Sequence, residues 1–249
     1  MYFIYIEFII LGIIVGALTG IMGSSGVVAV VPALIIINSV LPQDAIGTSL
    51  LIDVITSIVV AYVYFINKRV NLKKGFPMII GAIIGSQIGV RIAFLVPSEY
   101  IKIGFAIFII AMGIYSLLRN KHDKTEKNIN IKLSTFEIIL ITIPIGLATG
   151  VLGASGGIMF LMISILILKL DIKTAVGTAT FAMIISALSG SIGYLVAGNI
   201  ILIAAIIIGG ISIFSGFLFS KMGNKMRPET TYTVLGTIFI LIGIAQIVL

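Results

Sequence analysis

The sequence of 249 residues contains no cysteine, which excludes disulfide bonds and thiol chemistry. Its single histidine, His122, lies in a polar stretch, so neither a histidine metal cluster nor a histidine proton relay within the membrane is expected. Walker-type phosphate loops, dinucleotide-binding glycine fingerprints and metal-spaced ligands are missing as well. These absences predict a protein without a cofactor or a metal, and they argue against ATP-driven pumping by this chain alone.

Charge is also scarce, because only 10% of the residues are charged while 59% are hydrophobic. A soluble domain carries about 25% charged residues. Apolar stretches of about 20 residues, the length that crosses a bilayer as a helix, recur along the whole chain. They are solid runs, without the alternation typical of a membrane β-barrel. The sequence therefore predicts an all-α polytopic membrane protein, surrounded by lipid.

The basic residues that give the chain its net charge of +7 are gathered in the polar stretches between the apolar segments. Lysine and arginine accumulate in the cytoplasmic loops of membrane proteins, so this distribution predicts topology and gives no support to nucleic-acid binding. The basic stretches are residues 68–69, 73–74, 119–132, 169–173 and 221–227.

Ten hydrophobic segments are expected, five on either side of the polar stretch 119–132. We therefore divide the chain into a first transmembrane repeat (1–118), a cytoplasmic linker (119–132) and a second transmembrane repeat (133–249). The second and seventh segments, near 25–40 and 155–170, are short for a crossing of about 20 residues. If they are half-helices of re-entrant hairpins, eight full spans or hairpins remain.

The two halves are related by a shift of 130 positions, which superimposes Gly20 on Gly150, Gly23 on Gly153 and Ser25 on Ser155. Coincident glycine, serine and threonine positions indicate an internal duplication. Each basic loop of one half matches a loop without lysine or arginine in the other. The positive-inside rule then predicts inverted repeats, with both termini on the extracytoplasmic side.

A glycine cluster interrupts each half, at 19–26 and at 149–157. Matched interruptions in inverted repeats are typical of secondary transporters, whose broken helices bind the substrate near the middle of the membrane. The N–H groups of a restarted helix favour an anion. The alternative is that the glycines allow close helix packing. The predicted substrate-binding residues of the clusters are Gly23, Ser24, Ser25, Gly26, Gly153, Ser155, Gly156 and Gly157.

Hydroxyl residues open the segments that follow each cluster, in Gly47-Thr48-Ser49 and Gly177-Thr178-Ala179-Thr180. Thr48, Ser49, Thr178 and Thr180 are candidates for the polar lining of the same cavity. Helix capping explains them equally well, since threonine and serine are favoured at helix starts.

Asp53, Gln87 and Arg91 are the polar residues deepest within the apolar segments, and we expect them to serve gating or coupling. Ionisable groups inside a membrane are costly and therefore indicate function. Asp53 and Arg91 lie at similar depths, so a structural ion pair between them is one alternative. A second alternative is that the Arg91 side chain extends outward toward the membrane surface. A third is that Arg91 attracts anions to the outer opening of the transport pathway.

The sequence Gly153-Ala154-Ser155-Gly156 also matches the G-x-S-G pattern of intramembrane serine proteases. A nucleophilic serine needs a general base, and the only histidine lies in a hydrophilic stretch. We therefore expect no enzymatic activity.

At these residues the sequence resembles the sulfite exporter (TauE/SafE) family of membrane permeases, over essentially the whole chain. The resemblance rests on Gly20-x-x-Gly23-Ser24-Ser25-Gly26 before Pro32-Ala33-Leu34, on Ala45-Ile46-Gly47-Thr48, and on their counterparts from Gly150 to Gly157 and Ala175 to Thr178. It implies a cell-membrane permease, often eight-spanning, for sulfite, organosulfonates or related sulfur-containing anions.

Together these observations predict a permease that moves a small anion by alternating access, without chemistry on the substrate. A proton or sodium ion is a plausible coupling ion. A channel-like anion pore and an exchanger for cations or protons stay open as alternatives.

Overall fold

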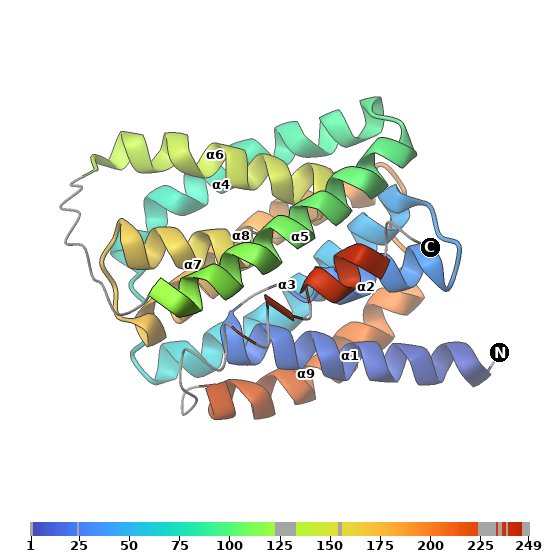
Figure 1. Cartoon of the computed structure of the whole chain (residues 1–249), viewed down its shortest axis with the longest axis horizontal. Coiled ribbons are helices and arrows are strands. Elements are labelled where there is room, and N and C mark those ends of the chain that lie inside the picture. Colours follow the sequence, from blue (N-terminus) through green and yellow to red (C-terminus); the bar gives the residue numbers. More distant parts are fainter. Residues whose placement is uncertain are drawn as a thin grey trace.

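The computed structural model describes residues 2–23, 25–122, 133–153, 156–223, 233, 236–237 and 239–245. Over these residues the chain is helical and contains no strand, which confirms the all-α class (Figure 1). The helices with defined bounds in this part of the chain are α1 (Tyr2–Met22), α2 (Val27–Ile36), α3 (Pro42–Ile66), α4 (Leu72–Leu95), α5 (Ser98–His122), α6 (Thr135–Leu152), α7 (Gly157–Leu166), α8 (Ile172–Val196) and α9 (Leu202–Gly223). Because α5 continues to His122, the predicted linker begins as helix, and residues 123–132 lie outside the described part.

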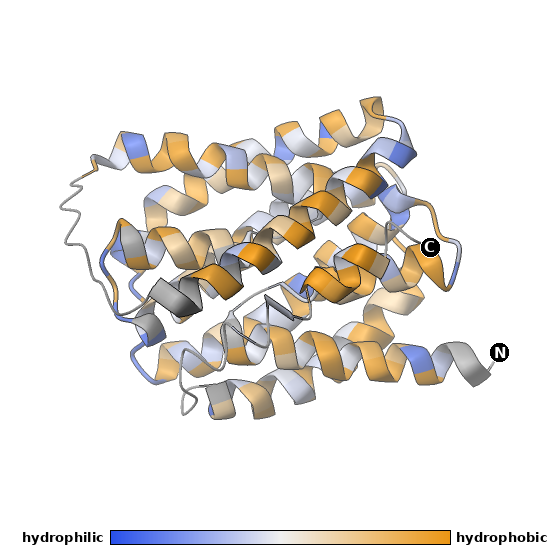
Figure 2. Ribbon diagram, viewed as in Figure 1, coloured by the Kyte–Doolittle hydropathy of each residue, from blue (hydrophilic) through white to orange (hydrophobic). Residues whose placement is uncertain are grey.

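Within the described residues, six helices are long and apolar enough to cross a membrane. They are α3, α4, α5, α6, α8 and α9, and α1 adds a shorter apolar stretch, Tyr5–Ile21. Apolar residues cover most of each helix, whereas hydrophilic residues gather near helix ends and connections (Figure 2). The multi-pass membrane character predicted from composition is confirmed, with six such helices where the sequence suggested eight spans or hairpins.

Two helices are too short to cross a bilayer. α2 and α7 have ten residues each. At 1.5 Å per residue a ten-residue helix is about 15 Å long, half of a hydrocarbon core of about 30 Å. α2 follows the glycine cluster of the first half and α7 follows that of the second half, so each cluster separates a long helix from a short one.

The closest helix contacts join the two halves of the chain: α4 runs along α6, and α1 runs along α9 (Figure 1). Gly85 of α4 lies so near α6 that a Cβ there would be 2.1 Å from the Ile143 carbonyl oxygen. In the other pair, a Cβ on Gly16 of α1 would be 2.5 Å from the Gly216 nitrogen. Small residues at four-residue spacing allow such approach in membrane helices. The crowded glycines are Gly12, Gly16, Gly20, Gly81, Gly85, Gly89, Gly146 and Gly150.

α3 and α8 pack against each other between these pairs, and matched hydrogen bonds tie each of them to the opposite half. The Thr48 hydroxyl accepts from the Ile201 amide at 2.8 Å, and the Thr178 hydroxyl accepts from the Asn71 amide at 2.9 Å. Both residues of the second bond are 130 positions from their counterparts in the first. The threonines therefore fasten the start of α3 to the α8–α9 loop and the start of α8 to the α3–α4 loop.

We expect Thr48→Val and Thr178→Val each to lower the free energy of unfolding by about 1–3 kcal/mol, because each leaves an amide without its acceptor. Thermal unfolding in detergent measures the loss. Thr237→Val is the matched control, since Thr237 is exposed and its hydroxyl donates to the nearby Thr233 carbonyl at 3.0 Å. Equal melting temperatures for all three variants would contradict this account.

The loops at the two ends of the bundle differ in charge. At one end Arg69 pairs with Asp171 at 3.4 Å, and the Lys74 amino group donates to the Leu168 carbonyl at 2.8 Å. Burial alone would raise the pKa of Asp171, but hydrogen bonds from Thr174 and the charge of Arg69 outweigh it and hold that pKa below its usual value. At the other end Asn199 donates to the Asp44 carboxylate at 2.6 Å. The two basic loops, predicted to share one side of the membrane, are therefore in contact.

Candidate functional site between the two helix breaks

The first break lies at Gly23, between α1 and α2. Its amide donates to the Thr19 carbonyl at 2.8 Å, and its φ of +61° is in the left-handed region, which glycine enters without steric cost. A Cβ on Gly23 would lie 2.8 Å from the Thr180 hydroxyl and 2.9 Å from Val176. The break therefore rests directly on α8. The Thr180 hydroxyl itself donates to the Val176 carbonyl at 2.8 Å.

The second break contains two left-handed glycines. Gly153 caps the C-terminus of α6 with a φ of +70°, and its amide donates to the Thr149 carbonyl at 2.9 Å. Gly156 is the N-cap of α7, also with a φ of +70°, and its carbonyl accepts from the Phe160 amide at 2.7 Å. The chain thus unwinds at Gly153 and starts a new helix directly after Gly156.

A buried carboxylate occupies the start of α2. Asp53 of α3 is fully buried; its Oδ1 accepts from the Gly26 amide at 3.0 Å, and its Oδ2 accepts from the Ser25 hydroxyl. A carboxylate at a helix N-terminus is stabilised by the helix dipole. The first break therefore holds an acidic side chain that belongs to the protein.

The ion pair between Asp53 and Arg91 that the sequence left open does not form. Asp53 points to the first break, whereas Arg91 is an exposed residue of α4. In the described part of the chain, the ion pair that does form joins Arg69 to Asp171. The sequence places Asp53 and Arg91 at similar depths, but similar depth does not put their side chains on facing sides of α3 and α4. The rotation of each helix about its axis decides which side chains face each other.

Gln87 fastens α4 to α8, at a place other than the breaks. Its amide nitrogen donates to the Ser189 carbonyl at 2.6 Å and to the Ser189 hydroxyl at 3.0 Å. Ser86 adds a bond to the same hydroxyl at 2.8 Å. These contacts give Gln87 a structural role, and the predicted gating role stays a prediction.

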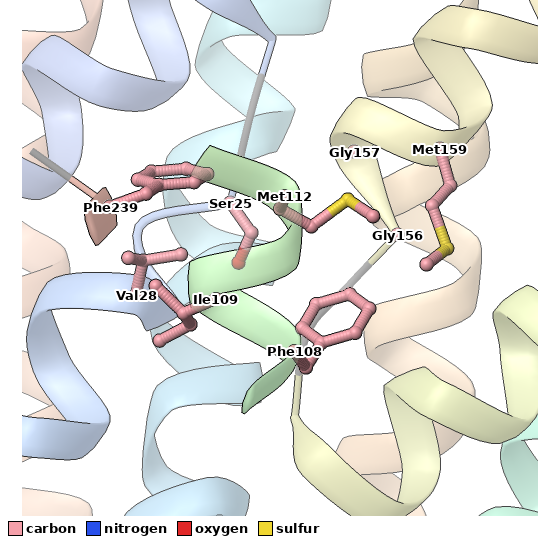
Figure 3. A pocket seen from close by; sticks show the side chains of 9 residues that line it. All are labelled: Ser25, Val28, Phe108, Ile109, Met112, Gly156, Gly157, Met159 and Phe239. Atoms are coloured by element: carbon pink, nitrogen blue, oxygen red, sulfur yellow. The ribbon is translucent and has the colours of Figure 1, made fainter. Parts of the chain in front are cut away.

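The two breaks face one cavity (Figure 3). Ser25 comes from the first break, Gly156 and Gly157 come from the second, and apolar side chains of α5 and of the C-terminal segment close the rest. The cavity has a volume of about 350 Å³, including the part open to solvent. Its lining residues are Ser25, Val28, Phe108, Ile109, Met112, Gly156, Gly157, Met159 and Phe239. Segments about 130 residues apart in sequence are thus brought together at this cavity.

Other predicted site residues do not line this cavity. The Thr48 hydroxyl donates to the Asp44 carbonyl at 2.6 Å, that of Thr178 donates to the Thr174 carbonyl at 2.7 Å, and that of Ser49 donates to the Ile46 carbonyl at 2.8 Å. These hydrogens are already committed to the backbone, so any contact with a substrate would require the bonds to be exchanged. Ser24 and Ser155 lie outside the described residues.

The apolar wall was not predicted from the sequence. Phe108, Ile109 and Met112 come from α5, and Phe239 comes from the last segment. Spacing within α5 places three of them on adjoining turns, but an apolar residue in an apolar run carries no signal that distinguishes a cavity from a lipid-facing surface. Only the tertiary arrangement shows which face of α5 meets the breaks.

Comparison with known proteins gives matches over most of the chain. The model of the family described as "Sulfite exporter TauE/SafE" matches residues 8–245. The chain is 27% identical to the probable membrane transporter protein YunE of Bacillus subtilis, over 96% of each chain. It is 29% identical to the probable membrane transporter protein MJ0441 of Methanocaldococcus jannaschii, over 95% of this chain and 92% of that one. No solved structure matches the chain significantly. The names of these relatives indicate a membrane transporter and not an enzyme.

Proposed function

The chain belongs to the sulfite exporter TauE/SafE family, and from that premise we propose that it is a secondary transporter for a small sulfur-containing anion, working by alternating access in the cell membrane. The observation that carries the proposal is the cavity between the two helix breaks, lined by Ser25 on one side and by Gly156 and Gly157 on the other. The substrate is moved without chemical change.

The anion binds at the start of α7. Two helices begin at the site, and each N-terminus favours negative charge. At α2 that preference is met by Asp53, which accepts from the Gly26 amide. The matching position on α8 carries Met183, a buried apolar residue. An external anion therefore finds its place at Gly156 and Gly157, with Ser25 facing it across the cavity.

The apolar wall favours an anion that has an apolar part. Phe108, Ile109, Met112 and Phe239 offer no hydrogen bonds to a strongly hydrated dianion, which would lose its water on binding. A short organosulfonate has its charge at one end and methylene groups at the other. It fits a site with glycine amides on one side and aliphatic and aromatic side chains opposite, so we rank organosulfonates above sulfite and sulfate.

Alternating access follows from two inverted repeats, 1–118 and 133–249, that exchange roles between inward-open and outward-open states. The matched bonds of Thr48 and Thr178 to opposite halves support this symmetry, as do the pairings of α4 with α6 and of α1 with α9. The contact between the basic loops near Arg69 and Asp171 supports a cytoplasmic location for that end of the bundle, and our proposal includes an extracytoplasmic location for both termini.

Uptake of labelled anions into proteoliposomes tests the proposal, with taurine-like sulfonates, sulfoacetate, sulfite, thiosulfate and sulfate compared. We expect saturable uptake that is fastest for a sulfonate and that shows trans-stimulation by unlabelled substrate inside. A channel-like pore would show flux without trans-stimulation, and an exchanger of cations would ignore all of these anions.

Ser25→Leu is expected to reduce that uptake at least tenfold, because a branched side chain would fill the cavity and remove its hydroxyl. Ser155→Leu, at the matching position of the second repeat, is expected to do the same. Thr237→Leu also replaces a hydroxyl side chain by leucine, on an exposed surface, and should transport normally. Wild-type rates in Ser25→Leu would refute the assignment of the site.

A further inference from the structure

We propose that Asp53 is the proton-coupling group of this transporter, and that Ser25 communicates the protonation state of Asp53 to the anion in the cavity. The inference rests on the proposed function, since it requires an anion between the two breaks. It deepens that function by naming the coupling ion and the residues that join it to the substrate.

The geometry of Ser25 is the first step. Ser25 lines the cavity, and its hydroxyl donates to Oδ2 of Asp53, which is fully buried behind it. A serine has one hydroxyl hydrogen. While that hydrogen is committed to the ionised carboxylate, Ser25 has only oxygen lone pairs to present to the cavity, and these repel an anion.

Protonation reverses the bond. When Asp53 takes a proton from water, its Oδ2–H becomes the donor and the Ser25 oxygen becomes the acceptor. The Ser25 hydrogen is then released to turn toward the cavity and donate to an anion oxygen. The Gly26 amide continues to donate to Oδ1 in both states, so the carboxyl group stays in place. One proton from water is added to Asp53 Oδ2 and no other covalent bond changes, while the hydrogen bond with Ser25 is reversed and a new one forms from Ser25 to the anion.

Electrostatic repulsion also links anion binding to protonation of Asp53. An anion in the cavity and an ionised Asp53 would be like charges separated by a single serine side chain, in surroundings that are mostly apolar. Their repulsion is stronger there than in water. Anion binding therefore favours protonation of Asp53, and by reciprocity protonation favours anion binding. Symport of the anion with a proton is the consequence.

The other ionisable groups on the helices that pack against α3 bond elsewhere or lie near helix ends. On α1, Glu7 accepts from Asn38 at 2.9 Å; on α8, the Tyr194 hydroxyl donates to the Gly150 carbonyl at 2.8 Å. On α9, Lys221 lies in the last turn over the Phe217 ring. α2 carries no ionisable side chain. The remaining ionisable residues of these helices are Tyr2, Tyr5, Glu99, Tyr100, Lys102, Tyr115, Arg119, Lys121, His122 and Lys173.

Two further buried hydroxyls offer a polar route to Asp53. Ser57 lies one turn along α3 from Asp53, on the same face, and Thr19 precedes the first break on α1. Both are fully buried, and in the described structure neither hydroxyl has a hydrogen-bond partner. Such groups can hydrogen-bond to water, and in this proposal they belong to the path by which a proton reaches the carboxylate.

The test uses purified full-length protein and methanesulfonate, whose charge does not change with pH in the range used, so any pH effect comes from the protein. Binding is measured by calorimetry in detergent. Uptake is measured in proteoliposomes that contain a pH-sensitive dye. For the wild type we expect the apparent affinity to fall about tenfold per pH unit on the alkaline side, as linkage to one proton requires. We also expect internal acidification that accompanies uptake.

Asp53→Asn should bind methanesulfonate with an affinity independent of pH and exchange it across the membrane, without acidification or accumulation driven by a proton gradient. Glu7→Gln makes the same acid-to-amide change on α1 and should keep the pH dependence of the wild type. The wild-type measurements decide the question even if Asp53→Asn does not fold. Uptake without proton movement, or driven by sodium instead, would overturn the coupling proposal and leave the transport function intact. Absence of binding and uptake for every anion tested would overturn the function itself.

Discussion

Gly85→Ala is expected to abolish the yield of folded protein or to lower its free energy of unfolding by about 3 kcal/mol, the upper range for overpacking. A Cβ at this position would lie 2.1 Å from the Ile143 carbonyl oxygen and 2.7 Å from the Leu147 nitrogen. Both atoms belong to the backbone of α6, so no side chain can move aside. The two helices would have to separate along the contact that joins α4 to α6.

Gly210→Ala is the matched control for this change. Gly210 also lies within a membrane helix, α9, but a Cβ there meets no atom within 4 Å. Alanine has the higher helix propensity, so this variant should be as stable as the parent or more stable by up to about 1 kcal/mol. Size-exclusion profiles and thermal unfolding in detergent compare the two. Equal behaviour of Gly85→Ala and Gly210→Ala would show that helix packing does not depend on these glycines.

The sequence could not separate the two roles that glycine has in this chain. Gly20 and Gly23 lie three positions apart in one cluster, yet Gly20 allows α1 to approach the Gly216 carbonyl and Gly23 breaks the helix with a positive φ. The same division holds for Gly150 and Gly153. Close packing and a helix break are alternatives for each cluster at the level of sequence, and the structure contains both. Backbone conformation and neighbouring helices decide between them, and neither is encoded in the local pattern.

The repeat was the most informative part of the sequence. A shift of 130 positions relates Thr48 to Thr178, and the two residues make matched hydrogen bonds to opposite halves of the protein. The sequence did not decide their role, because helix capping and cavity lining are equally compatible with threonine and serine at a helix start. Their hydrogen bonds show a third role, the fastening of one half to the loop of the other. Such a partner lies over 100 residues away and leaves no local signal.

Asp53 is a second residue whose partner in the fold could not be predicted from the sequence. An acidic residue in an apolar segment indicates function, but the sequence does not identify its partner. The structure places it against Ser25 and Gly26, which are 28 and 27 residues away in the sequence. That contact depends on the path of the short helix α2, which returns the chain toward α3. The contact gives a partner to the acidic residue that one repeat carries at Asp53 where the other carries Met183.

Gly156→Ala is expected to reduce anion uptake at least tenfold, because Gly156 forms both the start of α7 and part of the cavity wall. An L-residue at its φ of +70° costs about 1–2 kcal/mol in backbone strain. A Cβ would also lie 2.5 Å from Ile145 and 2.9 Å from Phe160. The backbone strain and the short Cβ contacts can be relieved together only if residue 156 leaves the left-handed region of backbone conformation. The start of α7, which forms part of the cavity wall opposite Ser25, would then change its conformation.

Gly198→Ala separates this effect on the site from backbone strain. Gly198 has a φ of +79°, so alanine there meets the same strain, but a Cβ at Gly198 has no atom within 4 Å. We expect Gly198→Ala to lower thermal stability by a similar amount, about 1–2 kcal/mol, and to transport normally once reconstituted. Uptake per folded molecule is therefore the decisive measurement. If Gly156→Ala transported like Gly198→Ala at equal protein content, the start of α7 would not be where the anion binds, and the site would have to be sought among the hydroxyls of α3 and α8.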